Sequence, residues 1–248
     1  MTARVFISYR TSDGADKATA LARDLDALFG QEQIFLDKDD LPAGSRWRDE
    51  VERALNDAPI LLVLVTPNYL GARHTDGTLC IEREVAPIEV AVFNVGGNVR
   101  FPLTETTERV YRKVWEMGAL GGFLMGREVA RAMLARGHGT IVFTGATASM
   151  RGGIGYCAFA GAKHALRALA QSMARELGPQ GIHVAHVVID GSIDTPFIAE
   201  NFPERYAKKS EDGILGPDAI AENYWTLHCQ PRSAWTHELD LRPWSETW

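Results

Sequence analysis

The chain has 248 residues, of which 46% are hydrophobic and 23% are charged, so it can bury a full core as one large α/β domain or two small ones. Its formal net charge of −6 gives no electrostatic reason to expect nucleic acid or an anionic membrane as a partner. No apolar run reaches the length of a membrane span, and the chain starts on a predicted strand rather than a signal-peptide core. Its three widely spaced cysteines indicate reduced thiols, so we expect a cytoplasmic protein without disulfides.

The first part of the chain alternates short apolar runs with helical patterns. Residues 5–8 and 34–36 are predicted strands, and residues 13–29 between them carry apolar side chains at helical spacing. Acidic residues, proline and glycine make residues 37–44 a predicted loop, and residues 59–65 are a predicted buried strand. Because strands alternate with helices, we expect a parallel sheet with right-handed crossovers.

Several motifs of this first part agree in order and spacing with those of one family. They are the run 5–10 (VFISYR) with Asp13, the run 34–37 (IFLD), Gly44, Trp47 and the strand end 65–67 (VTP). With these motifs, residues 1–85 resemble a bacterial TIR domain. The resemblance implies a flavodoxin-like fold and association through loop 37–44 with further copies or other TIR domains. It also implies either signalling or cleavage of the glycosidic bond of NAD+.

A glutamate is the catalytic residue that this resemblance implies. In enzymatic TIR domains it lies on a short helix after the third strand, and Glu84 matches that position, with Glu82 as the next candidate. Such an anion would stabilise the positive charge that develops on the ribose as the bond to nicotinamide breaks. Alternatively, Glu82 and Glu84 form a solvated charged face with Arg83, which is the commoner role of such residues.

Three further residues of the first part are candidates for contact with NAD. Arg10 and Asp13 follow the first strand, at the edge of the sheet where a ligand could reach them. They are equally consistent with an ordinary capping and loop pair. Trp47, at the start of a helix beside the acidic loop, is interpreted as a core anchor that could also stack on a ligand.

The second part of the chain continues the alternation of strands and helices. The helical stretch after its first strand is interrupted by a cluster of three glycines, Gly118, Gly121 and Gly122. A later helix carries an apolar stripe from Leu166 to Leu177, which suits either the core or a subunit interface. The predicted elements are strand 88–95, helix 105–135, strand 140–144, helix 155–177, strand 184–189 and edge strand 235–241.

Residues 78–97 can supply the helix and strand that both parts need at their junction. We therefore predict a three-layer, doubly wound and mostly parallel α/β sheet of flavodoxin-like or Rossmann-like type, continuous through residues 1–85 and 86–248. In this sheet the strand 59–65 lies beside the first strand, and the strand 88–95 lies beside the strand 59–65.

Motifs of residues 86–248 also agree with those of one family. They are Asn94 with Gly96, and the runs 141–145 (IVFTG), 159–163 (FAGAK), 174–177 (AREL) and 190–196 (DGSIDTP). With them, this part resembles the C-terminal two thirds of a short-chain dehydrogenase/reductase. The resemblance implies NAD or NADP as cofactor, contacts to it from Asn94, Gly96, Ile193 and Thr195, and a homo-oligomer paired through long helices.

The catalytic residues of that family are only partly present. In the family a serine, a tyrosine and a lysine, with a helix asparagine, relay the hydroxyl proton while hydride passes to or from the nicotinamide. Lys163 keeps the lysine position, but Phe159 replaces the tyrosine, Ala146 the serine and Gly118 the asparagine. A phenyl ring has no O–H, and losing the acid/base group costs about 10²–10⁴-fold in rate. Tyr156 precedes Lys163 by seven residues rather than four, so it is not a substitute.

Two further signals are weak or missing. The turn 8–14 (SYRTSDG), where a dehydrogenase of this family binds the diphosphate, has a single glycine and an aspartate. His237 and Glu238 lack a third ligand at metal-site spacing, so we expect surface residues and no metal.

Three functional hypotheses follow from these observations. The first is a TIR-type module that signals by self-association, with or without NAD+ hydrolysis, on a catalytically incomplete dehydrogenase-like scaffold. The alternative is an NAD(P)-dependent oxidoreductase of the short-chain dehydrogenase/reductase type. The third is a non-enzymatic binding or assembly protein in which neither site is active.

Overall fold

The computed structural model of the chain describes residues 5–8, 34–36, 60–63 and 88–247. The chain forms two compact units, residues 1–89 and 90–248. No helix in the described ranges is long and apolar enough to cross a membrane. The candidate site residues of the first unit lie outside the described residues; they are Arg10, Asp13, Trp47, Glu82 and Glu84.

The first unit contains a three-stranded parallel sheet. Its strands are β1 (Val5–Ser8), β2 (Ile34–Leu36) and β3 (Ile60–Val63), and their order is β2-β1-β3. In this register Phe6 lies opposite Phe35 on one side and Leu61 on the other. The three predicted strands are confirmed, as is the place of β3 beside β1.

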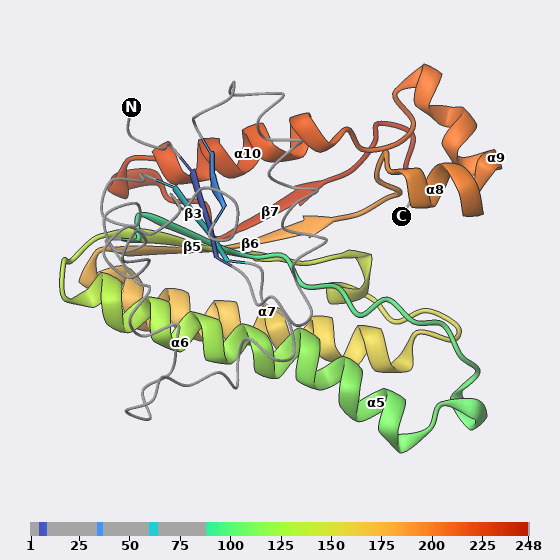
Figure 1. The fold of residues 1–248 in the computed structure, drawn as a ribbon, viewed down its shortest axis with the longest axis horizontal. Helices are drawn as coiled ribbons and strands as arrows, with labels where there is room; N and C mark the ends of the chain where they lie inside the picture. The colour runs from blue at the N-terminus through green and yellow to red at the C-terminus, as the bar shows by residue number, and fades with distance from the viewer. Residues whose placement is uncertain (1–4, 9–33, 37–59, 64–87, 248) are drawn as a thin grey trace, which may run out of the picture. The chain divides into compact units, whose positions relative to one another are not determined.

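The second unit contains a four-stranded parallel sheet (Figure 1). Its strands are β4 (Val90–Phe93), β5 (Gly139–Thr144), β6 (Ile182–Ile189) and β7 (Glu238–Leu241), in the order β4-β5-β6-β7. Strand β6 is buried along its whole length and β5 along all but its first residue. This is typical of central parallel strands that are covered on both faces. Strand β7 is an edge strand, as predicted.

The prediction of one continuous sheet is wrong. Among the described strands, β3 pairs with β1, β4 pairs with β5, and β3 and β4 belong to two separate sheets. Strand β4 is also shorter than predicted, and Val92 at its centre is 45% exposed. The alternate apolar residues Ile88, Val90 and Val92, which we interpreted as part of a fully buried strand, are half-buried or exposed. The buried residue of β4 is Phe93, on the opposite face.

Helices cover both faces of the four-stranded sheet, which gives three layers (Figure 1). Helices α5 (Glu108–Trp115), α6 (Gly121–Leu134) and α7 (Cys157–Leu177) lie on one face, and α10 (Pro217–Cys229) lies on the other. The α/β fold class is therefore confirmed. The short helices are α8 (Pro196–Asn201), α9 (Pro203–Tyr206), η1 (Leu103–Glu105), η3 (Thr147–Ser149), η4 (Gly178–Gln180), η5 (Ala207–Glu211) and η6 (Arg232–Ala234).

The interruption predicted at the glycine cluster is a change of helix type and not a break in the helical stretch. A π-helical segment, η2 (Glu116–Leu120), joins α5 directly to α6. A Cβ atom at Gly122 would lie 2.4 Å from the side chain of Leu166, and one at Gly118 would lie 3.1 Å from Cβ of Ala162. The glycines are therefore needed because α7 passes so close to this stretch.

The apolar stripe of α7 packs into the core of its own chain. Leu166 and Ala170 are fully buried and Leu177 nearly so. Leu166 is also the side chain that a Cβ atom at Gly122 of the neighbouring helical stretch would meet. Leu166, Ala170 and Leu177 therefore belong to the core of the chain, while Leu169 and Met173 are half-buried. Pairing of copies through this helix stays a prediction.

Candidate functional site

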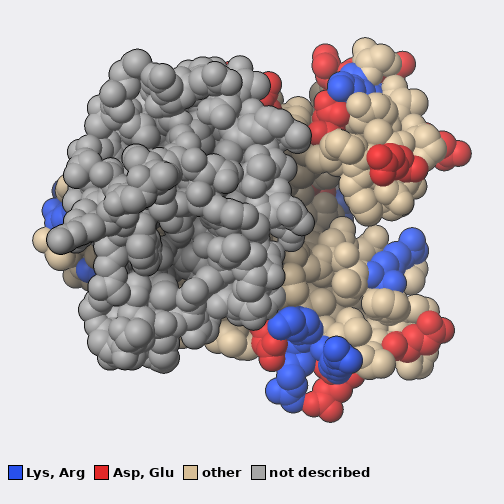
Figure 2. Space-filling model, viewed as in Figure 1, with Lys and Arg blue, Asp and Glu red and all other residues tan. Residues whose placement is uncertain are grey.

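The carboxyl ends of the four parallel strands of the second unit meet at one edge, where open α/β sheets bind their ligands. Strand β4 leads there to Asn94 and Gly96, both exposed, and β6 leads to the buried Asp190. Helices α8 and α9 lie beyond this edge (Figure 1). Figure 2 shows the surface hollowed between the lobe of α8 and α9, at the upper right, and the lobe that holds the start of α5.

Lys163 lies at this edge and joins the ends of two strands. Its side chain comes from the second turn of α7 and is only 4% exposed. The Nζ group donates hydrogen bonds to the carbonyl oxygen of Thr144, at 2.7 Å, and to that of Val95, at 3.1 Å. Burial lowers the pKa of Lys163 to about 8. The amine is thus fixed in place and partly neutral near physiological pH.

The side chains around Lys163 bring no hydroxyl group from the positions where the family has one. Phe159, one turn earlier on α7, is buried, and its ring centroid lies 5.9 Å from Nζ of Lys163. Ala146 follows β5, and its backbone N–H donates to the hydroxyl oxygen of Ser149 at 3.1 Å. Gly118 serves the packing of η2 against α7. Of the four positions where the family has its catalytic residues, position 163 is thus the one that keeps a polar side chain.

The other predicted contact residues have local structural roles. The hydroxyl of Thr195 accepts a hydrogen bond from the N–H of Ile198 and so caps the start of α8. Ile193 forms an isolated parallel bridge with Leu215. Both residues lie just after the end of β6, so the backbone of this segment borders the carboxyl edge.

Tyr156 does not take the place of the missing tyrosine. It occupies the N-cap position of α7, outside the helix proper. The guanidinium carbon of Arg100 lies 5.8 Å from the centre of its ring, in a cation–π contact. Tyr156 also precedes Lys163 by seven residues rather than four, so it does not replace the tyrosine that the family has one helical turn before the lysine.

The sequence alone did not single out Asp190 as a site residue. Its carboxylate is buried at the end of β6 and accepts a 2.5 Å hydrogen bond from the hydroxyl of Thr147, which follows β5. Guanidinium groups of Arg151 and Arg242 lie 3.8 and 3.9 Å away. This carboxylate therefore links the segments that follow the two neighbouring strands β5 and β6.

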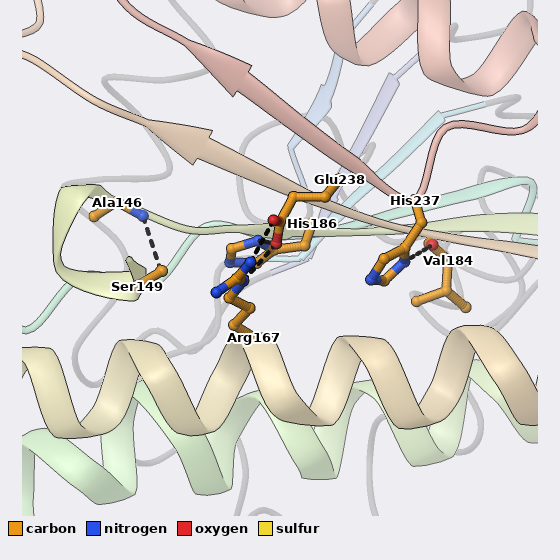
Figure 3. Close-up of polar contacts among 7 residues, drawn as sticks. All are labelled: Ala146, Ser149, Arg167, Val184, His186, His237 and Glu238. Carbon is orange, nitrogen blue, oxygen red and sulfur yellow. Dashed lines mark hydrogen bonds and ion pairs between the residues drawn. The ribbon is translucent and has the colours of Figure 1, made fainter. Parts of the chain in front are cut away.

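A second polar cluster joins Glu238, which we predicted to be a surface residue and which is half-buried, to the half-buried Arg167 and the fully buried His186. Arg167 donates two hydrogen bonds of 2.6 Å to the carboxylate of Glu238, and the Nδ1–H of His186 donates a third at 3.0 Å (Figure 3). Burial lowers the pKa of His186 to about 4, so the ring is neutral at pH 7. The hydrogen bond from Arg167 and its charge lower the pKa of Glu238. Its role is thus structural, at the junction of α7, β6 and β7.

His237 and His186 do not form a metal site with Glu238. His237 points away from this carboxylate and its Nδ1–H donates to the carbonyl oxygen of Val184 at 3.1 Å (Figure 3). No group of three or more histidine, cysteine, aspartate or glutamate side chains within the described part of the chain could hold a metal ion.

Weak signals for these missed residues exist in the sequence. Arg167 follows Lys163 by four residues, on the same face of a helix. His186 and Asp190 are polar residues within or just after an otherwise apolar strand, and such residues are buried only when they have partners.

Two family models match the chain. Residues 73–205 match that of the short chain dehydrogenase, and residues 5–89 match that of the TIR domain. Among curated proteins, 3-oxoacyl-[acyl-carrier-protein] reductase MabA of Mycobacterium avium is 33% identical over 115 residues, which are 46% of this chain and 45% of MabA. The 3-dehydrosphinganine reductase of Danio rerio is 28% identical over 181 residues, or 71% and 54% of the two chains. The chain thus spans about half the length of the curated relatives it matches.

Solved structures show the same kind of fold. A short-chain dehydrogenase from Rhodopseudomonas palustris is 38% identical, with a TM-score of 0.57 and coverage of 97% of this chain and 99% of the other. Serine dehydrogenase complexed with NADP+ in its closed form is 14% identical, with a TM-score of 0.61 and coverage of 98% and 96%. At 14% identity, the similarity to serine dehydrogenase shows only that the two proteins share a fold.

Proposed function

The chain belongs to the short chain dehydrogenase family, and from this premise we propose that it is a nicotinamide-nucleotide-linked oxidoreductase acting on a carbonyl or alcohol group. The observation that carries the proposal is the position of Lys163. It is a buried amine held between the ends of β4 and β5, at the edge where this fold binds ligands.

The residues present fit the nicotinamide end of such a nucleotide. Lys163 offers a donor at the strand ends, the exposed Asn94 directly follows β4 and precedes Val95, and a Cβ atom at Gly96 would meet nothing within 4 Å. This open space leaves room for a ribose next to the backbone. When bound, the nucleotide would supply or accept the hydride. The turn that would face its diphosphate falls outside the described residues.

The chain's own residues give a slow proton transfer. Lys163 can hold a proton at Nζ, because its lowered pKa of about 8 lies near the working pH. Phe159 excludes water from this amine but exchanges no proton with substrate. Without the hydroxyl groups, we expect turnover about 10²–10⁴-fold below that of a complete enzyme of this kind.

The test combines nucleotide binding with turnover. Binding of NADH and NADPH is measured by fluorescence, and their oxidation is followed with a panel of aldehydes and ketones. Phe159→Tyr should raise turnover by about 10²-fold or more, because it restores an O–H one turn from Lys163. Phe159→Leu is the matched control and should leave turnover unchanged. Absence of nucleotide binding by the folded full chain would refute the proposal.

The second candidate function is that of a TIR domain: signalling by self-association, with NAD+ hydrolysis at Glu84. It is supported by the TIR match of residues 5–89 and by the parallel order β2-β1-β3. The test follows free nicotinamide and oligomer size after addition of NAD+. Nicotinamide release that Glu84→Gln abolishes and Glu82→Gln preserves would support it. Self-association without either activity would favour the third possibility, a binding or assembly protein.

A further inference from the structure

Three hydroxyl side chains lie at the end of β5 or just after it, and one of them has a carboxylate partner. The hydroxyl of Thr144, a residue that is 9% exposed, pairs with that of Tyr224 at 2.8 Å. Ser149 is fully buried, and its hydroxyl oxygen accepts from a backbone N–H. Thr147 is half-buried, and its hydroxyl donates to the carboxylate of Asp190 at 2.5 Å. Of the three hydroxyls, that of Thr147 is therefore the one that a ligand can reach.

Thr147 is next in sequence to a position where the family has a catalytic residue. It directly follows Ala146, which replaces the serine of the family, and it is the first residue of η3. The carbonyl oxygen of Thr144, on the same segment, accepts the 2.7 Å hydrogen bond from Nζ of Lys163. The side chain of Arg151 is 43% exposed. The segment that carries Thr147 thus borders solvent at the carboxyl edge of the sheet, where this fold binds ligands.

The hydrogen bond to Asp190 determines what the hydroxyl of Thr147 can offer a ligand. A threonine hydroxyl has one hydrogen to donate and two lone pairs that accept. The carboxylate engages the hydrogen, so the lone pairs remain for a ligand that brings its own O–H. The carboxylate is buried, and the guanidinium groups of Arg151 and Arg242, 3.8 and 3.9 Å away, balance its charge. A reachable hydroxyl bonded to a buried carboxylate is an arrangement that can take a proton from an alcohol.

We propose that Thr147 is the catalytic residue that accepts the hydroxyl proton of an alcohol substrate, and that Asp190 receives the proton of Thr147. The proposal rests on the proposed function, because NAD+ or NADP+ is the oxidant. The O–H proton of the alcohol moves to Oγ1 of Thr147 while the hydroxyl proton of Thr147 moves to Oδ1 of Asp190. The C–H bond of the carbinol carbon breaks, and its hydride passes to the nucleotide. The alcohol is thus oxidised to an aldehyde or ketone with reduction of the nucleotide, and Asp190 then releases the proton to solvent.

The first experiment measures turnover in the full chain. Oxidation of a panel of primary and secondary alcohols by NAD+ and NADP+ is followed through the absorbance of the reduced nucleotide. Thr147→Val removes the hydroxyl at nearly constant volume, so turnover should fall by about 10²-fold or more, whereas Thr147→Ser should keep most of it. Thr226→Val is the matched control, because the hydroxyl of Thr226 is exposed on α10 and bonds to the carbonyl oxygen of Glu222. Parental turnover in folded Thr147→Val, or nucleotide binding by the parent without any alcohol oxidation, would overturn the proposal.

The variant Asp190→Asn separates proton transfer from the structural link between the two segments. The amide oxygen of asparagine still accepts the hydrogen bond of Thr147, but the amide does not take up its proton. The turnover number should therefore fall by about 10²-fold, while the KM for the alcohol and the affinity for the nucleotide stay unchanged. Circular dichroism checks the fold of the variant. A turnover number equal to that of the parent would show that the pair only links the segments.

Alcohol binding provides a readout that requires no nucleotide. Trifluoroethanol is titrated into the full chain and its binding is followed by fluorine NMR. The parent and Asp190→Asn should bind it about fivefold more tightly than Thr147→Val, which lacks the accepting oxygen. Equal affinities of parent and Thr147→Val would contradict the proposal even if the nucleotide binds. The proposed function, by contrast, is refuted by the absence of nucleotide binding, so the two failures can be told apart.

Discussion

At Gly145 there is no room for a side chain. A Cβ atom there would lie 2.4 Å from Nε2 of His186 and 3.0 Å from the hydroxyl oxygen of Ser149, and both of these side chains are fully buried. Neither can retreat into solvent. We therefore expect Gly145→Ala to lower the free energy of unfolding by about 1–3 kcal/mol in urea titrations. Gly152→Ala, in a position with nothing within 4 Å, is the control and should change it little.

His186 predicts a dependence of stability on acid pH. Its folded-state pKa of about 4 lies below the ordinary value of 6.5, so the unfolded chain binds a proton between these values that the folded chain does not. Stability should therefore fall as the pH drops from 6.5 to 4, by at most about 3 kcal/mol from this group. Urea titrations at several pH values test this. A His186→Gln protein that loses stability over this range as steeply as its parent would contradict the assignment.

At the scale of single residues, the sequence predicts only part of the candidate site. Lys163, Phe159 and Ala146 were found because short local motifs carry them. Asp190, Arg167 and Glu238 were not assigned their roles, because each acquires its partner from an element 43 or more residues away, as in the pairs Thr147 with Asp190 and Arg167 with Glu238. Spacing along one element carries no information about such contacts.

At the scale of elements, the Arg167–Glu238 pair fastens helix α7 to the edge strand β7. Arg167→Lys loses the paired hydrogen bonds that only a guanidinium group can form with a carboxylate. We expect a loss of about 1–2 kcal/mol and faster hydrogen exchange of the β7 amides. The exposed pair of Arg112 with Glu108 provides the control, since Arg112→Lys should have nearly no effect. Unchanged exchange in β7 after Arg167→Lys would show that the pair does not anchor the strand.

Elements were predicted well where they are long and periodic. Strands β5 and β6 and helix α7 were located to within two residues of their ends. The region from Glu108 to Leu134 was harder, because its glycines signal a break in sequence but serve close helix packing in space. Only the position of α7 opposite them distinguishes these two roles.

At the scale of the whole molecule, two separate sheets predict two steps of unfolding. The two sheets belong to different compact units, and chains with more than one such unit commonly depart from two-state behaviour. Hydrogen exchange of peptides at increasing urea concentration should give one midpoint for β1 and β3 and another for β5 and β6. Coincident midpoints for all four strands would argue against independent units.

The sequence did not determine whether the strands form one sheet or two. Both families were correctly recognised, because their motifs are local. Whether β3 pairs with β4 depends instead on contacts between distant elements, and the helix and strand predicted within residues 78–97 are compatible with either arrangement.

The order of strands in the second sheet has a consequence for synthesis of the chain. Spatial order and chain order coincide from β4 to β7, so each new strand can dock on the edge left by the one before it as the polypeptide emerges from the ribosome. No strand has to be inserted between two that have already paired. In the first sheet, by contrast, β3 docks on the opposite side of β1 from β2. The second sheet can thus form strand by strand in the order of synthesis. Until β7 has paired with it, β6 has an unpaired edge that other chains could reach.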